Sequence, residues 1–282
     1  MIIYQNSTSL QKKLSHFLDN CKSVGFVPTM GALHEGHLAL VEQAITENDC
    51  TVVSIFVNPT QFNNPQDLEK YPRTIEKDVA LLKKLDRNII IFSPNASELY
   101  QGNINSTEYN FGPIENEMEG KHRPGHFNGV GTVLNLLFNA VNPTKAYFGE
   151  KDFQQLQIVK KLVELEKLPV KIIGCPIIRE KSGLAMSSRN KRLSEIELEE
   201  ATLIYKTLKE VREKFNKTSI STLNQLVETK FKNHPLFTLE YFEIAATDTL
   251  KTCTEKEKNT SYRAFIAVFI GGVRLIDNIA LN

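Results

Sequence analysis

Residues 24–37 read VGFVPTMGALHEGH and are the most informative stretch of the chain. The apolar run that ends at Val27 predicts a strand, the glycine-bearing residues after it predict a turn, and the apolar spacing over 37–48 predicts a helix. The first turn of a helix carries unpaired N–H groups and the positive end of the helix dipole, which together favour phosphate oxygens. His34 and His37 are three residues apart and can face the same bound group. The stretch therefore predicts a strand, a turn and a helix with an anion site at the turn.

Two other interpretations of this turn rest on the same residues. Gly31 and Gly36 have the spacing of a phosphate-binding P-loop. Positions 37 and 38, however, are histidine and leucine where that loop has a lysine and a hydroxyl. Without those groups to reach the terminal phosphates and hold magnesium, a P-loop kinase or GTPase is disfavoured. A structural turn with two surface histidines explains the turn, taken alone, as well as an anion site does.

Strand-like and helix-like patterns alternate around this unit. Branched apolar runs predict strands over 23–27, 51–57, 88–92, 145–148 and 170–178. Apolar residues at helical spacing predict helices over 37–48, 74–85, 127–141 and 152–166. This alternation predicts an α/β fold, a doubly wound parallel sheet with helices on both faces. Ligands of such sheets bind beyond the carboxyl ends of the strands, where 28–37, 58–61 and 149–152 are expected.

The pattern changes after residue 178. A predicted capping box at Ser194 and Glu197 begins a charged helix that runs towards Lys214. The other elements predicted here are a helix over 221–232 and strands over 239–245, 263–269 and 273–276, with a turn at 271–272. We therefore predict two domains, residues 1–177 and a smaller α+β domain over 178–282. Residues 102–125 show little regular pattern and are predicted to form a loop system over the site.

The composition disfavours nucleic acid and membranes as partners. The 282 residues carry 34 basic and 33 acidic side chains, so no overall field attracts an anionic polymer or surface. Neither a leader-like start nor an uninterrupted run of 18 apolar residues is seen, which predicts a cytoplasmic protein with small-molecule partners. The cysteines are scattered, without metal-ligand spacing, and are expected to be reduced and mostly buried. They are Cys21, Cys50, Cys175 and Cys253.

Two further segments contain groups suited to phosphate. Residues 149–152 (GEKD) follow a predicted strand, and there Lys151 can neutralise a phosphate while Gly149 permits a close backbone approach. Residues 186–190 (MSSRN) offer two hydroxyls and a guanidinium. Taken singly, a helix start capped by Asp152 and a solvated linker between the domains explain these two segments better.

Three loop residues are candidates for binding an acidic or hydroxylated substrate. Gln61, within 58–62 (NPTQF), can donate and accept hydrogen bonds at once. Tyr71 is a candidate pocket wall, and Arg123 is a candidate anion clamp from a mobile lid. Ordinary turns and helix starts explain the first two of these positions equally simply. The histidines at the ends of 122–126 have helical spacing, but the proline and glycine between them disfavour a zinc site.

Taken together, six motifs resemble those of the pantothenate synthetase (pantoate:β-alanine ligase) family in order and approximate interval. They are PTMGALHEGH (28–37), NPTQF (58–62), YPRT (71–74), RPGHF (123–127), FGEKD (148–152) and MSSRN (186–190). Each motif alone is weak, whereas their ordered coincidence over residues 24–190 is highly specific. HEGH also resembles the HIGH motif of class I aminoacyl-tRNA synthetases, and MSSR resembles their KMSKS loop. The resemblance implies a Rossmann-like fold of the nucleotidylyl transferase type.

The resemblance also implies an activity and its residues. It implies a homodimeric enzyme that uses ATP and Mg²⁺ to join pantoate to β-alanine through a pantoyl adenylate, releasing AMP and pyrophosphate. The implied catalytic residues are His34, His37, Lys151, Ser187 and Arg189. The implied ATP contacts are Met30, Gly31, Ala32, Leu33, His34, Glu35, Gly36, His37, Gly149, Glu150, Lys151, Asp152, Ile178, Met186, Ser187, Ser188 and Arg189. Gln61 and Gln155 match the pantoate-binding amides, with Tyr71 and Arg123 as further substrate candidates.

Two points depart from this pattern or lie beyond it. Ser188 stands where a KMSKS loop has a lysine, so Lys151 and Arg189 are expected to supply the positive charge. The Mg²⁺ ligands are not determined by the sequence, and the candidates among the carboxylates are Glu76, Asp78 and Asp152.

Three rival functions are weighed against this one. A nucleotidylyltransferase that joins AMP to a phosphorylated acceptor would also place histidines in a glycine-rich first turn. A non-catalytic nucleotide sensor would bind ATP but need neither the paired glutamines nor the imidazoles. A tRNA synthetase is disfavoured, because about a hundred residues after Ile178 leave little room for an anticodon-binding module.

Overall fold

The protein, here a computed structural model, is described over residues 2–20, 22–63, 65–86 and 88–282. Contacts within the chain divide it into two compact units. The first contains the residues up to Phe111 together with His122–Glu150 and Gln155–Pro176. The second contains Gly112–Lys121, Lys151–Gln154 and Ile177–Asn282. Two short segments that precede residue 177 in the sequence are therefore part of the second unit.

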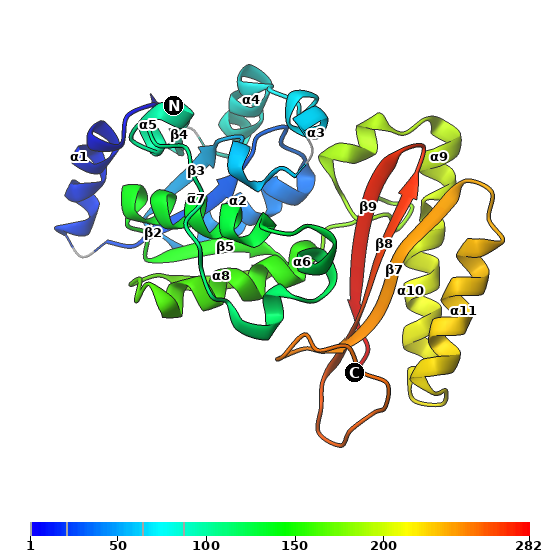
Figure 1. Ribbon diagram of the computed structural model, residues 1–282. Coiled ribbons are helices and arrows are strands. Elements are labelled where there is room, and N and C mark those ends of the chain that lie inside the picture. Colours follow the sequence, from blue (N-terminus) through cyan, green and yellow to red (C-terminus); the bar gives the residue numbers. More distant parts are fainter. Residues whose placement is uncertain (1, 21, 64, 87) are drawn as a thin grey trace. The chain divides into compact units, whose positions relative to one another are not determined.

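The first unit is built on a six-stranded, entirely parallel sheet in the order β1-β4-β3-β2-β5-β6 (Figure 1). Its strands are β1 (Ile3–Tyr4), β2 (Val24–Thr29), β3 (Cys50–Ile55), β4 (Ile90–Phe92), β5 (Lys145–Gly149) and β6 (Lys171–Cys175). The predicted parallel α/β fold is confirmed. From β2 the chain adds strands first on one side and then, from β5, on the other, so the sheet reverses its strand order between β2 and β5.

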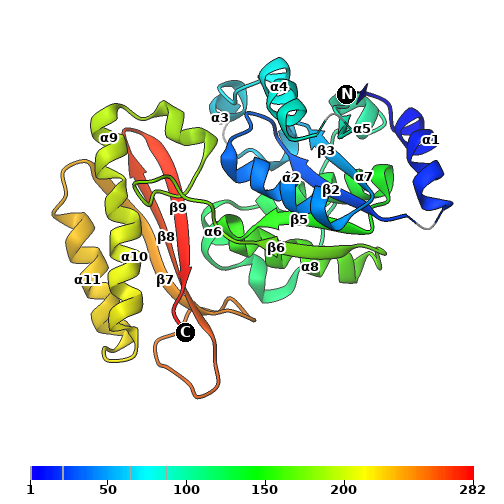
Figure 2. The same cartoon turned by 180° about the vertical axis from the view of Figure 1, so that it is seen from behind.

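Helices cover both faces of this sheet (Figures 1 and 2). They are α1 (Ser7–Leu18), α2 (Glu35–Glu47), α3 (Pro65–Glu69), α4 (Ile75–Leu85), α5 (Ala96–Leu99), α7 (His126–Val141) and α8 (Phe153–Leu165), with the 3-10 turns η1 (Pro59–Gln61) and η3 (Glu150–Asp152). Leucines of α2 and α4 pack on one face, against Val27 and Val53. On the other face Phe138 of α7 packs edge-on against Phe26. Alternate residues of one strand thus enter different cores, as the pleat requires.

The second unit contains an antiparallel sheet in the order β7-β8-β9. Its elements are β7 (Phe237–Ala246), β8 (Tyr262–Ile270), β9 (Val273–Ala280), α9 (Glu195–Glu200), α10 (Thr202–Phe215), α11 (Ile220–Lys232), η2 (Gly112–Glu115), α6 (Met118–His122) and η4 (Ser188–Arg192). Helices α10 and α11 pack against this sheet and bury an aliphatic and aromatic core. The predicted capping box at Ser194 and Glu197 is present, but the single helix predicted there is divided at Ala201, where the backbone tightens.

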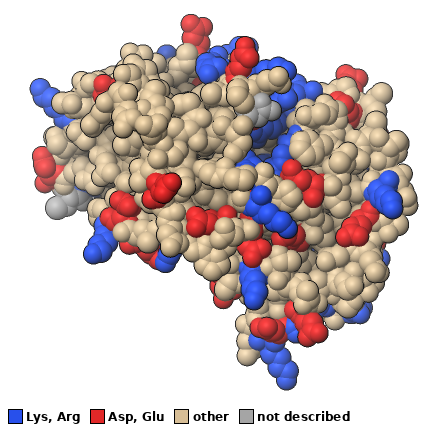
Figure 3. All heavy atoms as spheres, in the orientation of Figure 1, with Lys and Arg blue, Asp and Glu red and all other residues tan. Residues whose placement is uncertain are grey.

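Surface and loop features complete the fold. Residues 102–125 form the predicted irregular stretch, interrupted only by η2 and α6. No helix among the described residues is long and apolar enough to cross a membrane. Acidic and basic side chains are both spread over the face shown in Figure 3. Cys50 and Cys175 are buried and Cys253 is partly exposed, all three without a disulfide, whereas Cys21 lies outside the described residues.

Candidate active site

A buried carboxylate supports the turn that follows β2. Gly31 and Ala32 both have positive φ, +79° and +51°, and such a conformation costs energy for an alanine. Asp78 of α4 is 1% exposed and accepts hydrogen bonds from the N–H groups of Ala32 (3.0 Å) and Leu33 (2.8 Å). The Thr74 hydroxyl donates to the same carboxylate (3.2 Å). These bonds offset the backbone strain and fix the path of the chain into α2. They also give Asp78 a structural role in this turn.

The two histidines cap α2 reciprocally. Their ring centroids are 4.0 Å apart. His34 is the N-cap residue, and its Nδ1 accepts a hydrogen bond from the N–H of Gly36 (3.2 Å), while Nδ1 of His37 accepts from the N–H of His34 (3.4 Å). A ring nitrogen that accepts a hydrogen bond carries no proton, so a neutral imidazole held this way has its proton on Nε2. In that tautomer Nε2 is the hydrogen-bond donor of each ring.

The chain itself uses most of the backbone amides at this turn. The N–H of His37 donates to the His34 carbonyl (2.8 Å), and the N–H of Gly31 donates to the Thr29 hydroxyl (3.2 Å). With Ala32, Leu33, His34 and Gly36 bonded as above, few amides remain for a ligand. The sequence pattern assigned the anion site to helix-end amides, and in the structure most amides of this turn are bonded within the chain.

Gln61 lies at the end of η1, beyond the carboxyl end of β3. Its Nε2 donates to the Met30 sulfur (3.2 Å), and its Oε1 accepts from the Asn58 side chain (3.2 Å). Asn58 is 1% exposed, and its Oδ1 accepts from the Tyr100 hydroxyl (2.6 Å). Asn58 therefore orients the Gln61 amide, a role that the sequence analysis did not assign, although Asn58 belongs to the quoted NPTQF motif.

Side chains at and just before the start of α7 contact the backbone carbonyl of Gln61. The Gln61 carbonyl is 2.9 Å from Nδ1 of His126 and accepts from Nη2 of Arg123 (3.4 Å). Helix α7 approaches closely here, because a Cβ at Gly129 would lie 2.4 Å from the Thr60 carbonyl oxygen. The structure thus brings Arg123 to Gln61, as a shared site requires. His126 is a buried member of this cluster that the sequence analysis considered only for zinc.

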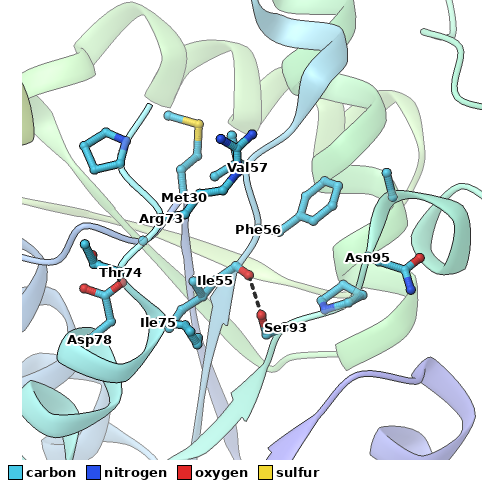
Figure 4. A pocket seen from close by; sticks show the side chains of 14 residues that line it. Met30, Ile55, Phe56, Val57, Arg73, Thr74, Ile75, Asp78, Ser93 and Asn95 are labelled. Atoms are coloured by element: carbon cyan, nitrogen blue, oxygen red, sulfur yellow. Dashed lines mark hydrogen bonds between the residues drawn. The ribbon is translucent and has the colours of Figure 1, made fainter. Parts of the chain in front are cut away.

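A cavity of about 290 Å³ opens beside the ends of β2, β3 and β4. Figure 4 shows residues that line it, with Met30, Arg73 and Val57 near one another, Phe56 on the segment that follows β3 and Ile55 at the end of that strand. Two of the polar side chains that line it are bonded to the backbone, since Ser93 Oγ donates to the Ile55 carbonyl (3.0 Å) and Asp78 accepts the bonds described above. Tyr71 packs edge-on against Phe62, with ring centroids 5.7 Å apart, and neither ring is among the residues that line this cavity. The cavity lies at the carboxyl edge of the sheet beside β2, β3 and β4, and not at the reversal of strand order between β2 and β5.

The second unit contains the turn with Lys151. Nζ of Lys151 lies 3.8 Å from the half-exposed carboxylate of Asp152, a separation that gives a weak ion pair. The Lys151 carbonyl accepts a hydrogen bond from Nδ2 of Asn278 on β9 (2.9 Å). Helix α8 begins at Phe153, directly after η3, so Asp152 stands at the position of the predicted cap. Gln155 lies partly buried on α8, whereas its neighbour Gln154 is 3% exposed and bonds to residues 114–119.

The segment 186–190 is also part of the second unit and is closely anchored. The Met186 N–H donates to the Ile178 carbonyl (3.0 Å), so the structure brings together two of the predicted ATP contacts. The Ser187 hydroxyl caps η4 by accepting from the Arg189 N–H (3.3 Å). Asn190 is buried and donates to the Ala185 carbonyl (3.1 Å). Ser187 and Arg189 are therefore presented by a fixed turn.

The described residues contain no group of three or more His, Cys, Asp or Glu side chains that could hold a metal ion. The Asp78 carboxylate and the two imidazoles at the turn after β2 are instead hydrogen-bonded to the backbone. A divalent ion that accompanies a nucleotide can be held largely by phosphate oxygens and water.

The fold and these residues define a class of protein. The sheet is parallel and reverses its strand order between β2 and β5, a histidine-bearing turn follows β2, and Gln61 lies nearby. This combination is that of a ligase with a nucleotidylyltransferase-type fold.

Comparisons with known proteins give the family. A sequence model of the pantoate-beta-alanine ligase family matches residues 2–280. The pantothenate synthetases of Flavobacterium psychrophilum and Christiangramia forsetii are each 54% identical over 282 residues, which is 100% of this chain and of each relative. The crystal structure of the Thermus thermophilus pantothenate synthetase aligns with a TM-score of 0.91 at 38% identity, over 100% of this chain and 99% of that one. The Francisella tularensis pantoate-beta-alanine ligase, complexed with beta-gamma ATP and beta-alanine, aligns with a TM-score of 0.81 at 38% identity, over 100% and 98%. The chain belongs to the pantothenate synthetase family.

Proposed function

We propose that this enzyme condenses (R)-pantoate with β-alanine to pantothenate through a pantoyl adenylate, with release of AMP and pyrophosphate. The reciprocal histidine cap at the start of α2 is the observation that carries the proposal, because it holds two imidazoles side by side just after β2. ATP and β-alanine as substrates agree with the complex of the Francisella tularensis relative.

The first step is proposed to activate the acid. A pantoate carboxylate oxygen attacks the α-phosphorus of ATP, an O–P bond forms, and the bond to the β-phosphate oxygen breaks so that pyrophosphate leaves. Negative charge moves onto the leaving phosphates, and donors already fixed in place stabilise it without reorganisation. The groups proposed for this role are His34, His37, Lys151, Ser187 and Arg189, with the remaining predicted ATP contacts lining the nucleotide. Mg²⁺ would enter as the counter-ion of ATP.

The second step is proposed to form the amide. The neutral amine of β-alanine attacks the acyl carbon, AMP leaves with the bridging oxygen, and the nitrogen loses one proton. Gln61 and Gln155 are proposed to bind pantoate and then its adenylate, because a side-chain amide can hydrogen-bond to a hydroxyl and a carboxylate at once. Tyr71 and Arg123 are proposed to line the same substrate site. No covalent enzyme nucleophile is needed, since the phosphate anhydride supplies the leaving group.

Exchange of labelled pyrophosphate into ATP tests the proposal. We expect exchange that requires pantoate and proceeds without β-alanine, and amide formation only when β-alanine is added. Exchange supported only by a phosphorylated acceptor would instead indicate a nucleotidylyltransferase, and ATP binding without any exchange would indicate a sensor. Replacing His37 by alanine distinguishes an enzyme from a nucleotide sensor, because we expect the enzyme to lose turnover far more than ATP binding.

Two other properties are proposed from the family resemblance alone. The protein is proposed to be a homodimer and to act in the cytoplasm. Light scattering coupled to gel filtration tests the first, and a molar mass near 32 kDa would contradict it.

A further inference from the structure

Two adjacent polar residues near the end of the chain are buried on β9. Asp277 is 4% exposed and Asn278 is 1% exposed. Neighbouring residues of a strand point to opposite faces of the sheet, so one strand can send a polar group in each direction. Buried polar groups are costly unless they are bonded, and the bonds of these two residues lead to two different segments.

Asp277 anchors the chain that leads to residues 186–190. Its carboxylate forms a two-pronged ion pair with Arg179, with distances of 2.6 and 3.0 Å. Arg179 also donates to the Gly183 carbonyl (3.2 Å) and stacks on the Tyr205 ring at 3.7 Å. A β-bridge joins Arg179 to Ala185, directly before Met186. The ion pair therefore fixes the base of the hairpin that presents Ser187 and Arg189.

Asn278 anchors the turn that contains Lys151. Its Nδ2 donates to the Lys151 carbonyl (2.9 Å), and its Oδ1 accepts from Nη1 of Arg263 (2.5 Å). Arg263 in turn lies over the Phe153 ring, 4.1 Å from its centroid, just after the same turn. The amide is thus held at both ends and cannot rotate without losing a bond. The bond from Asn278 Nδ2 to the Lys151 carbonyl fixes the distance between the Lys151 backbone and β9.

Electrostatic attraction also links Asp277 to both segments. Burial raises the pKa of Asp277, while Arg179 and, more weakly, Lys151 act in the opposite direction. The carboxylate thus attracts both a guanidinium and the ammonium group proposed to contact ATP. Neither Asp277 nor Asn278 is among the residues expected to touch the nucleotide.

We propose that Asp277 and Asn278 are positioning residues. They hold the turn that contains Lys151 and the segment 186–189 in the relative positions that ATP binding requires. This inference rests on the proposed function, in which both segments bind the triphosphate. The two residues act through hydrogen bonds to Arg179 and to the Lys151 carbonyl, not through contact with substrate. Strand β9, drawn red in Figure 1, is then a part of the ATP subsite contributed by the end of the chain.

The test compares near-isosteric variants of the full-length protein. Asp277→Asn removes one prong and the charge of the ion pair, and Asn278→Asp removes the donor to the Lys151 carbonyl. Glu210→Gln is the matched control, because it removes ion pairs to Lys214 and Lys230 in the same unit without touching either segment. For the two β9 variants we expect the KM for ATP to rise at least tenfold, with the KM values for pantoate and β-alanine within twofold of wild type. The control is expected to leave all three values unchanged.

A binding measurement makes the outcome decisive. Calorimetric titration with a non-hydrolysable ATP analogue should show the same tenfold weakening in both variants, without any turnover. A folded Asp277→Asn protein whose Kd for the analogue stays within twofold of wild type would overturn the proposal, as would equal losses for all three substrates. If Asp277→Asn does not fold, Arg179→Lys keeps the charge but loses the two-pronged geometry, and an unchanged Kd in that variant and in Asn278→Asp refutes the role. Failure of wild-type pyrophosphate exchange would instead refute the proposed function, so the two failures are distinguishable.

Discussion

Replacing Asp78 by asparagine should destabilise the turn after β2 and impair turnover together. The carboxylate offers one oxygen to the Ala32 N–H and the other to the Leu33 N–H. Asparagine keeps one acceptor oxygen and turns its NH₂ group towards the other N–H. One bond to a charged acceptor is then lost, about 1.5–3 kcal/mol, and a buried donor is left unsatisfied. We expect a loss of about 3 kcal/mol, which corresponds to a Tm lowered by about 6–12 °C for a domain of this size.

The functional part of this prediction follows from the position of the turn. Because the bonds to Asp78 fix the chain directly before His34, a displacement of the turn carries both imidazoles with it. A shift of about 1 Å in positioned groups can cost about a hundredfold in rate, so kcat/KM for ATP should fall by about ten- to a hundredfold. Thermal unfolding followed by circular dichroism and initial-rate measurement of AMP release check the two parts.

A matched control separates this effect from general loss of charge. Glu42 is an exposed acid of α2, so Glu42→Gln makes the same chemical change in the same unit without a buried bond. Its Tm and kcat/KM should equal those of wild type. An Asp78→Asn protein with a Tm indistinguishable from that of wild type would show that the carboxylate does not support the turn, and the reasoning would fail.

Three further predictions concern close packing, buried thiols and the helix cap. Gly129→Ala should lower stability by several kcal/mol and weaken pantoate binding, because its Cβ would lie 2.4 Å from a carbonyl oxygen of η1; an unchanged Tm contradicts this. Burial raises the pKa of Cys50 to about 11, so the folded state keeps a proton that the unfolded thiol loses near pH 9. The free energy of unfolding should therefore fall as pH rises from 9 towards 11, and Cys50→Ala should flatten that part of the urea-unfolding profile. His34→Ala should lose about 1 kcal/mol of stability, whereas His34→Asn should retain it, because asparagine caps helices well. Both variants should lose turnover. Equal activity of His34→Asn and wild type would exclude a role for the imidazole.

Local pattern accounts for most of the fold that the sequence predicted. The apolar run ending at Val27 and the helical spacing after it report on neighbours along the chain, and so does the capping box at Ser194. These elements occur within a few residues of their predicted bounds. The parallel order of the sheet follows from their alternation, because parallel strands need crossover helices. The ordered motifs indicated the family in the same way.

Long-range pairing accounts for what the sequence could not predict. The bonds from Asp78 to the turn span 46 and 45 residues, and the Arg179–Asp277 pair spans 98. No periodicity reports on such a distance. The inclusion of Gly112–Lys121 in the second unit has the same origin, since Gln154 bonds to its backbone and Arg274 pairs with Glu119 (2.7 Å). A loop without periodic pattern gives no indication of the unit against which it packs.

Buried carboxylates support a proposed anion-binding segment in each unit, and this use of acids requires a physical reason. A carboxylate beside a triphosphate site repels the ligand unless its charge is balanced. Asp78 is balanced by two backbone N–H groups and Asp277 by the Arg179 guanidinium. Each acid therefore orients donors while little of its charge is left to act on ATP. If residual repulsion prevailed, Asp78→Asn and Asp277→Asn would both bind ATP more tightly than wild type. We expect weaker binding in both, because the lost hydrogen-bond geometry outweighs the removal of a charge that is already compensated.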